Sequence, residues 1–560
     1  MKNLIFIFIL IFCSTFLFSQ TTIPGGPVWG TWDLAGSPYL IEGDIVILLD
    51  TLIIEPGVTV IFQDHYKFNV GIGDFEGQLL AIGAEQDSIL FTAADPDIGW
   101  CGIRFETELS YLDSSRIKYC RIEYGKATGT GNDTKGGAIY CDLFSEVEIA
   151  YCNITNNYTE HPDGGAIYLE NSEPLIHHLK IQNNENGGIF SNELCSNISE
   201  SKICNNTNYG LKKFHKIINC EVFNHEYGII YSEVIENCKI FDNDYGIIDI
   251  LGETNDQIII NSFISNNEYA MNYDNGWSTG NYELVGCVIT NNDHGLFSSC
   301  GFDMSVVNCT FAYNDDYGIH IWEYQSQQPR SNVSILNTIF FMNEDNIEIE
   351  LFPRLSVSVD YSLINDAPTG VNIGDNCITG NPDFVDPSSG VGSNYNGLIA
   401  DWSLDNTSIC INQGIPDTTG LNIPELDIAG NPRIYQGDIP RIDIGAYEFQ
   451  GEPQIGIDNF QLPVVNFQLS NYPNPFNPET KISFSIAGSD DREKNVSITI
   501  YNIKGQRVKK LVKEKMKLGR YFIIWNSKDQ NGKPVSSGIY FYQLDVEGKT
   551  RKTCKMLLLK

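Results

Sequence analysis

The sequence predicts an all-β chain in which a solenoid of short strands is followed by a small antiparallel β-sandwich. The main observation is a repeat of 18 residues in the stretch 215–250, where HKIINCEVFNHEYGIIYS is followed by EVIENCKIFDNDYGIIDI. Cys220 and Cys238 occupy equivalent places in the two copies, and a Tyr-Gly-Ile triplet follows each, beginning at Tyr227 and Tyr245. Such a repeat is typical of solenoids, whose units bury their apolar faces against neighbouring units.

The frame around these cysteines recurs on both sides of the stretch. Its central residue and the residue two places later share one face of a strand, because strand side chains alternate. The residue before the centre is Asn or Gly in the later copies, and both accept the left-handed backbone that a sharp corner needs. In the two earliest copies this residue is Tyr119 or Tyr151. The central position recurs as Cys120, Cys152, Ser262, Cys287, Cys309 and Thr338.

This frame resembles the right-handed parallel β-helix repeat of the pectate-lyase-like superfamily, over roughly residues 100–386. The resemblance implies the architecture and no particular activity, because function depends on the sites that a fold carries. The segment 388–450 ends in NPRIYQGDIPRIDIGAYEF, which resembles the closing motif of many bacterial surface β-helix proteins. We therefore expect a final segment that is pinned to the solenoid.

The two ends of the chain indicate export. Residues 1–20 read as a secretory signal, with Lys2 as the charge and an apolar run over residues 4–18. No later run is long and apolar enough to span a bilayer, so no transmembrane segment is expected in the mature chain. The predicted organisation is a signal peptide (1–20), an N-terminal cap with the first coils (21–99), the β-helix (100–387), its closing segment (388–450), a linker (451–467) and a C-terminal domain (468–560).

The C-terminal domain is predicted from alternating strands separated by turns at Lys504-Gly505 and Asn531-Gly532. The opening SNYPNPFNPET, the later SSGIY and the basic end KMLLLK strongly resemble the type A C-terminal sorting domain of the type IX secretion system. The resemblance implies that residues 468–560 bind the type IX secretion machinery. It also implies a Gram-negative bacterium, in which the protein is secreted or attached to lipopolysaccharide at the outer-membrane surface.

Charge is divided unevenly along the chain. The formal net charge is −35, yet residues 468–560 carry 18 Lys and Arg against 8 Asp and Glu. Nucleic acid is not expected as a partner, because neutralising phosphates requires basic side chains. An acidic solenoid suits an extracellular surface, where divalent ions screen it.

The cysteines have two interpretations. The chain has 15 Cys, and extracellular cysteines usually form disulfides. Here the recurring cysteines occupy the inward position of each unit, where Ser262 and Thr338 replace them, which favours a stack of buried thiols. Neighbouring units lie about 4.8 Å apart, so an occasional bridge is sterically conceivable.

One candidate binding site is a column of aromatic residues that each precede a small residue at the start of a strand. The column contains Tyr209, Tyr227, Tyr245, Tyr269, His294 and Tyr317, and Glu226, Asp244 and Glu268 precede three of its members. One interpretation is a strip where the rings bind sugars and the carboxylates hold hydroxyls or calcium. The alternative is that the rings stack on one another from coil to coil while the acids are solvated. Like charges at this spacing repel, so the acids splay outward or hold a cation between them.

A second column contains Tyr140, Tyr168 and Phe190, whose rings are candidates for carbohydrate binding. Asp142 and Glu170 flank it and are weak candidates for catalysis. On adjacent coils they would lie about 5 Å apart, close to the separation in a retaining glycosidase. Such a pair also needs separated pKa values and a pocket, which the sequence does not show.

The sequence therefore predicts a secreted or cell-surface β-helix protein that binds polysaccharide or acts as an adhesin, and that is not an enzyme. The alternatives are a polysaccharide lyase or glycoside hydrolase, and a structural component of a surface layer. No cofactor is expected, apart from calcium at the acidic column.

Overall fold

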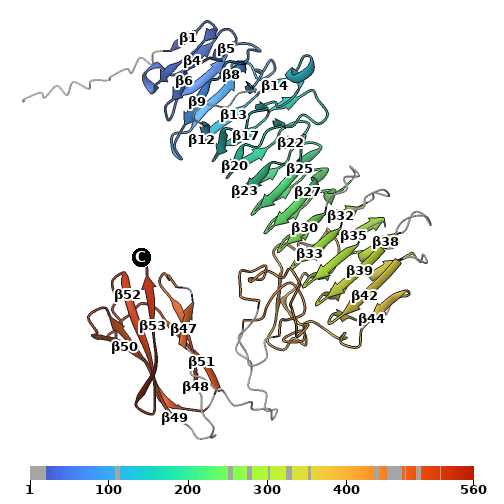
Figure 1. Ribbon diagram of the computed structural model, residues 1–560, viewed down its shortest axis with the longest axis vertical. Helices are drawn as coiled ribbons and strands as arrows, with labels where there is room; N and C mark the ends of the chain where they lie inside the picture. Colours follow the sequence, from blue (N-terminus) through green and yellow to red (C-terminus); the bar gives the residue numbers. More distant parts are fainter. Residues whose placement is uncertain are drawn as a thin grey trace, which may run out of the picture. The chain divides into compact units, whose positions relative to one another are not determined.

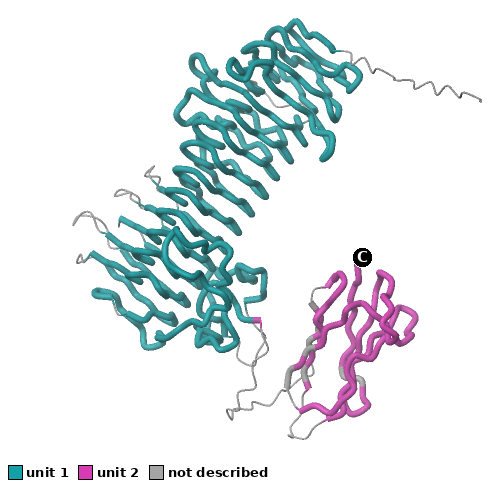
Figure 2. The backbone as a smooth tube through the Cα atoms, turned by 180° about the vertical axis from the view of Figure 1, so that it is seen from behind, with its two compact units in different colours: residues 1–435, 441–449 teal, residues 436–440, 450–560 magenta. Residues whose placement is uncertain are grey.

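The computed structural model describes residues 20–107, 114–249, 256–273, 281–299, 303–322, 331–350, 355–366, 368–433, 441–450, 469–472, 474–486, 494–517 and 519–559. The predicted signal peptide, apart from its last residue, and the predicted linker lie outside these residues. The chain divides into two compact units, shown in teal and magenta in Figure 2. The first unit holds the β-helix with its closing segment, and the second holds the C-terminal domain.

Successive coils of the first unit contribute one strand each to a parallel sheet of 15 strands, which we call the corner sheet (Figure 1). Its strands are β1 (Thr21–Ile23), β4 (Tyr39–Ile41), β7 (Thr59–Phe62), β10 (Ile89–Ala93), β13 (Cys120–Glu123), β17 (Asn153–Thr155), β21 (Lys180–Gln182), β24 (Lys202–Cys204), β26 (Glu221–Phe223), β28 (Lys239–Phe241), β31 (Phe263–Ser265), β34 (Val288–Thr290), β37 (Thr310–Ala312), β40 (Ile339–Phe341) and β43 (Leu363–Ile364).

The remaining coil strands form a parallel sheet of 27 strands, to which most coils contribute two. Its strands are β2 (Gly26–Pro27), β3 (Gly30–Trp32), β5 (Ile45–Ile47), β6 (Thr51–Ile54), β8 (Phe68–Gly73), β9 (Gln78–Ile82), β11 (Ile103–Thr107), β12 (Ser115–Lys118), β15 (Ile139–Asp142), β16 (Val147–Ala150), β19 (Ile167–Glu170), β20 (Leu175–His177), β22 (Ile189–Ser191), β23 (Asn197–Ser199), β25 (Tyr209–Ile218), β27 (Tyr227–Glu236), β29 (Tyr245–Ile248), β30 (Gln257–Ile260), β32 (Tyr269–Tyr273), β33 (Tyr282–Val285), β35 (His294–Ser299), β36 (Met304–Val307), β38 (Tyr317–Trp322), β39 (Ser331–Leu336), β41 (Asp345–Ile349), β42 (Leu355–Asp360) and β44 (Val371–Ile373).

These ladders confirm the predicted all-β parallel solenoid. The repeat of 18 residues is one coil, because Val222 pairs with Ile240 across β26 and β28 in the register that the sequence predicts. The stretch predicted as cap and first coils contributes β1 to β10, so it consists largely of coils. Two short helical turns, η1 (Leu34–Gly36) and η2 (Gly131–Thr134), and the paired strands β14 (Lys126–Ala127) and β18 (Tyr158–Thr159), lie outside the two large sheets.

The recurring cysteines point into the coil, as predicted. Cys220 and Cys238 are each 1% exposed, and both are free thiols, as are the other described cysteines. Ser262 and Thr338 are fully buried at the equivalent places. The structure therefore shows a stack of small buried side chains along the coil axis and no bridge among the described cysteines.

A ladder of buried amides fixes a second corner of the coil. A typical Asn donates its Nδ2–H to the Oδ1 of the next Asn, as between Asn243 and Asn267 at 3.0 Å, and to a backbone carbonyl such as that of Val222 at 3.2 Å. His225 replaces one Asn, and Asn206 contacts its Nε2 at 3.1 Å. Inward-pointing amides need such partners, because an unpaired buried polar group is costly. The ladder runs through Asn157, Asn184, Asn206, His225, Asn243, Asn267, Asn292, Asn314 and Asn343.

The closing segment contains β46 (Asp401–Leu404), which pairs with β45 (Phe384–Asp386) just before the segment. It covers the outer face of the corner sheet from β31 onward. Trp402 and Ile444 are fully buried there in one cluster with outward side chains such as Val288 and Leu363. Asn308 of the solenoid also donates hydrogen bonds to backbone carbonyls of the segment, including that of Asp443 at 3.1 Å. The segment is therefore pinned to the solenoid, as expected.

The second unit is a small antiparallel sandwich, as predicted. Its core contains Trp525, Ile498 and Leu544, all fully buried. One sheet has three strands, β47 (Leu469–Tyr472), β48 (Thr480–Ile486) and β51 (Gly519–Trp525), and the other has four, β49 (Lys494–Asn502), β50 (Arg507–Met516), β52 (Gly538–Val546) and β53 (Lys549–Leu558).

Candidate functional site

The strongest candidate site lies at the corner where the chain turns from β12, β16, β20 and β23 into the corner sheet. The corner residues of these four coils are Tyr119, Tyr151, His178 and Glu200, with φ angles of 51°, 56°, 54° and 52°. This left-handed conformation costs a residue with a side chain of order 1–3 kcal/mol. The corner residues of the next six coils also have positive φ, and all are Asn or Gly: Asn219, Asn237, Asn261, Gly286, Asn308 and Asn337. These four coils therefore keep strained residues where the next six coils have residues that accept this conformation readily.

The rings of this corner row stack on one another. The Tyr119 and Tyr151 ring centroids are 4.7 Å apart, and those of Tyr151 and His178 are 4.5 Å apart. The stack begins at Tyr119, because the equivalent residue of the preceding coil is Gly83, which has no side chain. Tyr151 is still 40% exposed, so the stack presents aromatic surface to solvent.

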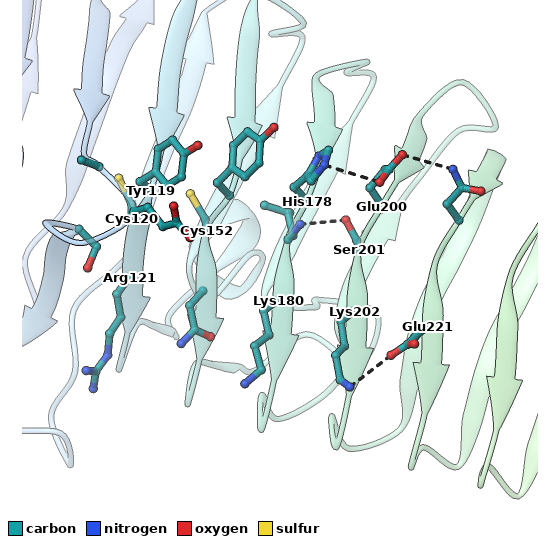
Figure 3. A pocket seen from close by; sticks show the side chains of 17 residues that line it. Tyr119, Cys120, Arg121, Cys152, His178, Lys180, Glu200, Ser201, Lys202 and Glu221 are labelled. Atoms are coloured by element: carbon teal, nitrogen blue, oxygen red, sulfur yellow. Dashed lines mark hydrogen bonds and ion pairs between the residues drawn. The ribbon is translucent and has the colours of Figure 1, made fainter. Parts of the chain in front are cut away.

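A second row of polar side chains runs beside the corner row, on the first outward positions of β13, β21, β24 and β26. Its members Arg121, Lys180, Lys202 and Glu221 follow the parallel register of the sheet (Figure 3). Lys202 Nζ lies 3.2 Å from the carboxylate of Glu221, and Arg121 donates to the buried Glu123 at 2.6 Å. The side chains of Arg121 and Lys202 are about half exposed.

The two rows flank an open groove with a volume of about 740 Å³, which we call the corner groove. Figure 3 shows Tyr119, His178 and Glu200 along one side and Arg121, Lys180 and Lys202 along the other. The backbone of the inward residues between the rows, such as Cys120, forms the floor. Concave sites with aromatic walls and a few polar groups are where ligands bind most often.

Neighbouring charges hold His178 in the corner row. His178 Nε2 lies 3.6 Å from Glu200 Oε2, and its Nδ1 lies 2.9 Å from Nδ1 of His177. His177 Nε2 in turn contacts Glu148 at 3.2 Å. The hydrogen bond from Lys118 outweighs burial and lowers the pKa of the Glu148 carboxyl. These contacts extend outward from the groove and orient its polar wall.

The first predicted column is a stack of rings from Tyr227 on, whereas Tyr209 is fully buried in one cluster with the second column. Ring centroids are 5.4 Å apart between Tyr227 and Tyr245, 4.9 Å between Tyr245 and Tyr269, and 4.4 Å between Tyr269 and His294. The rings therefore stack on one another, as in the structural alternative, and only their edges remain for a ligand. The flanking Glu226, Asp244 and Glu268 are exposed. Within the described ranges, no three His, Cys, Asp or Glu side chains come together as a metal site.

The second predicted column is in register but covered. Tyr140 pairs with Tyr168, and Tyr168 with Phe190, as expected for adjacent coils. Their exposed fractions are only 0%, 4% and 7%. Arg104 lies over the Tyr140 ring at 4.3 Å, and Lys135, just after η2, lies over Tyr168 at 4.9 Å. Cationic side chains therefore already occupy these aromatic faces, and carbohydrate binding by this column stays a prediction.

Asp142 and Glu170 are neighbours on β15 and β19, as predicted. Burial, and then the nearby Glu170 carboxylate, raises the pKa of Asp142. Burial also acts to raise the pKa of Glu170, but hydrogen bonds from Lys135 at 2.7 Å and Tyr140 at 2.8 Å outweigh it and lower that pKa. The two carboxyls thus have the separated pKa values that acid–base chemistry needs. Glu170, however, is already engaged by two side chains that also belong to the covered column.

Two family models match parts of this chain. The secretion system C-terminal sorting domain matches residues 470–559, and the periplasmic copper-binding protein (NosD) model matches residues 106–284. No protein of the curated set matches the chain. The crystal structure of dimeric latent PorU from Porphyromonas gingivalis is 20% identical over 18% of this chain and 10% of that chain, with a TM-score of 0.15. The matched part is therefore about a tenth of that structure.

The fold and the family matches together define the class of protein. The chain is a right-handed parallel β-helix that carries a type IX C-terminal sorting domain. The sorting domain indicates a secreted or cell-surface protein that interacts with the secretion machinery. In the described part of the chain, no helix is long and apolar enough to cross a membrane.

Proposed function

We propose that the protein is a polysaccharide-binding or adhesion module of the bacterial surface and that it binds glycan in the corner groove. The observation that carries this proposal is the row of Tyr119, Tyr151, His178 and Glu200 in a left-handed conformation that the next coils assign to Asn and Gly. Strained residues persist where function requires their side chains. Here they place exposed aromatic surface beside a row of hydrogen-bonding groups, and glycans offer apolar ring faces together with hydroxyls.

The proposal is tested by glycan-array binding of the mature full-length chain. Tyr151→Ala should abolish retention of any glycan that binds, because it removes the most exposed ring of the groove. Tyr361→Ala is the matched control, since Tyr361 has the same left-handed conformation, with a φ of 47°, at the corner after β42. Equal loss in both variants, or no retained glycan at all, would contradict the proposal.

A second candidate function is cleavage of polysaccharide by Asp142 and Glu170. The opposite pKa shifts of the two carboxyls favour it. The test is an assay for new reducing ends and unsaturated products, with Asp142→Asn as the variant. Turnover that Asp142→Asn abolishes would replace the binding proposal with an enzymatic one.

Calcium and lipopolysaccharide are further proposed partners. Calcium would bind between two neighbouring carboxylates of the exposed series Glu226, Asp244 and Glu268, whose coils stack in register. Calorimetric titration of calcium into the protein, compared with Glu268→Gln, tests this site. Attachment to surface lipopolysaccharide would follow removal of the sorting domain.

A further inference from the structure

The charges of the corner groove are balanced. Its lining includes three carboxylates and three cations, namely Glu85, Glu200, Glu221, Arg121, Lys180 and Lys202. Both signs line the groove, since Lys202 contacts Glu221 at 3.2 Å and Glu200 lies on the side opposite Lys180 (Figure 3). The formal charges of these six side chains therefore cancel.

The surroundings of the groove disfavour anions. Residues 1–467 carry 18 Lys and Arg against 63 Asp and Glu. A surface with this excess of negative charge lowers the local concentration of anions, and a groove without net charge does not reverse that effect. A uronate or sulfated polymer would therefore gain little from the cations of the second row, because acidic side chains already pair with two of them.

The groove has the length and the chemistry to bind a linear ligand with many hydroxyls. Its two rows cross five coils, from that of Tyr119 to that of Asn219, which is about 20 Å at ~4.8 Å per coil. Carboxylates accept hydrogen bonds and ammonium groups donate them, so a groove that offers both suits hydroxyls, which do both. Tyr119 and Tyr151 supply the apolar surface beside them.

We propose that the corner groove binds an uncharged, linear polysaccharide, whose hydroxyls bridge the carboxylates and cations of the two rows. This inference rests on the proposed function and narrows it to one class of glycan. Glu200 accepts hydrogen bonds from the ligand, and Lys180 donates them from the opposite side.

The test compares neutral and anionic oligosaccharides of equal length on the mature full-length chain. The probes are hexamers of xylose, mannose and glucose against hexamers of galacturonate and mannuronate, titrated at about 20 mM and about 500 mM NaCl. We expect a neutral hexamer to bind with an affinity that salt changes by less than about twofold, since screening acts on charged ligands.

Three variants locate the site. Glu200→Gln and Lys180→Met should each weaken binding of the neutral hexamer roughly tenfold, because each removes a hydrogen bond to a charged group. Lys239→Met is the matched control, because Lys239 continues the same row on β28 beyond the groove and should leave the affinity unchanged. Thermal melting checks that each variant is folded.

The outcomes separate this inference from the proposed function. Binding of a uronate hexamer that falls steeply with salt and is lost in Tyr151→Ala would overturn the neutral-ligand inference while leaving the groove a glycan site. Neutral binding that Glu200→Gln and Lys180→Met leave intact would also overturn it. The absence of binding by either class would overturn both.

Discussion

Glu200 places a carboxylate in the corner groove at the expense of a strained backbone. Its backbone has a φ of 52°, which Asn tolerates better than Glu does. Its contacts with His178 and Asn219 are exposed and contribute little to stability. The free energy of unfolding should therefore improve when Asn replaces it, even though a groove carboxylate is lost.

We predict that Glu200→Asn raises the free energy of unfolding by about 1 kcal/mol. Urea denaturation measures the change. The same variant should weaken glycan binding. A variant that is more stable but binds more weakly would show that Glu200 serves binding and not the fold. A destabilised variant would show that Glu200 serves the fold instead.

His225 takes one place in the amide ladder, between Asn206 and Asn243. Burial lowers the pKa of its imidazole from 6.5 to about 4. Below pH 6.5 the unfolded chain takes up a proton that the folded chain refuses, so stability falls as the pH drops towards 4. The loss approaches about 3 kcal/mol for a shift of this size.

We predict that His225→Asn removes this loss, because an amide continues the ladder and does not titrate. Denaturation curves at pH 7 and pH 4 should differ less for the variant than for the wild type. An unchanged pH dependence would mean that groups other than His225 control acid stability.

The closing segment is the element whose stability responds to high pH. Glu448 and Asp443 are buried beside Arg433. Burial raises the pKa of Glu448 to about 9 and that of Asp443 to about 6. Because folding favours the protonated Glu448, the stability that it contributes is lost as the pH rises through about 9.

We predict that Glu448→Gln makes the closing segment resistant between pH 7 and about pH 10, since the amide mimics the protonated carboxyl. Limited proteolysis across this pH range, followed by mass spectrometry of cleavage within 388–450, measures the effect. Glu425→Gln is the control, because Glu425 is exposed in the same segment. Wild-type protein that stays intact at pH 10 would contradict the prediction.

The elements were predictable where they depend on local repetition. Asn219 and Asn237 revealed the corners because few residues accept a left-handed backbone, and Cys220 revealed the inward position. The corner groove was missed because Leu179 and Ser201 follow His178 and Glu200 at the position where most other coils have Cys. The repeat is therefore hard to recognise in these two coils. The signal was present in Tyr119 and Tyr151, which depart from Asn at the same corner.

The covered column could not be predicted, because its burial depends on residues distant in sequence. Lys135, just after η2, lies over Tyr168, and no repeat specifies that contact. Lys212 lies over Phe190 as the next residue of the same column. The alternation of strand residues showed only that these rings point away from the coil axis. Whether an outward ring meets solvent depends on the loops that fold over it.

At the scale of the whole molecule, the sorting domain and the solenoid are separate compact units with separate tasks. We predict that deletion of 468–560 leaves the β-helix folded, because the core of the solenoid is intact. The protein should stay trapped in the periplasm, because the domain that directs its export is lost. Cell fractionation with an antibody against the solenoid measures the location. Surface display of the truncated protein would contradict the assignment of export to this domain.

The closing segment covers the last five strands of the corner sheet, from β31 to β43. The six strands from β13 to β28 can therefore gain or lose whole coils without disturbing the contacts of the closing segment. A tandem duplication of one turn there would extend the ligand track by a single step of ~4.8 Å. The length of the polysaccharide that is recognised thus changes in discrete increments, while the apolar core continues through the added coil.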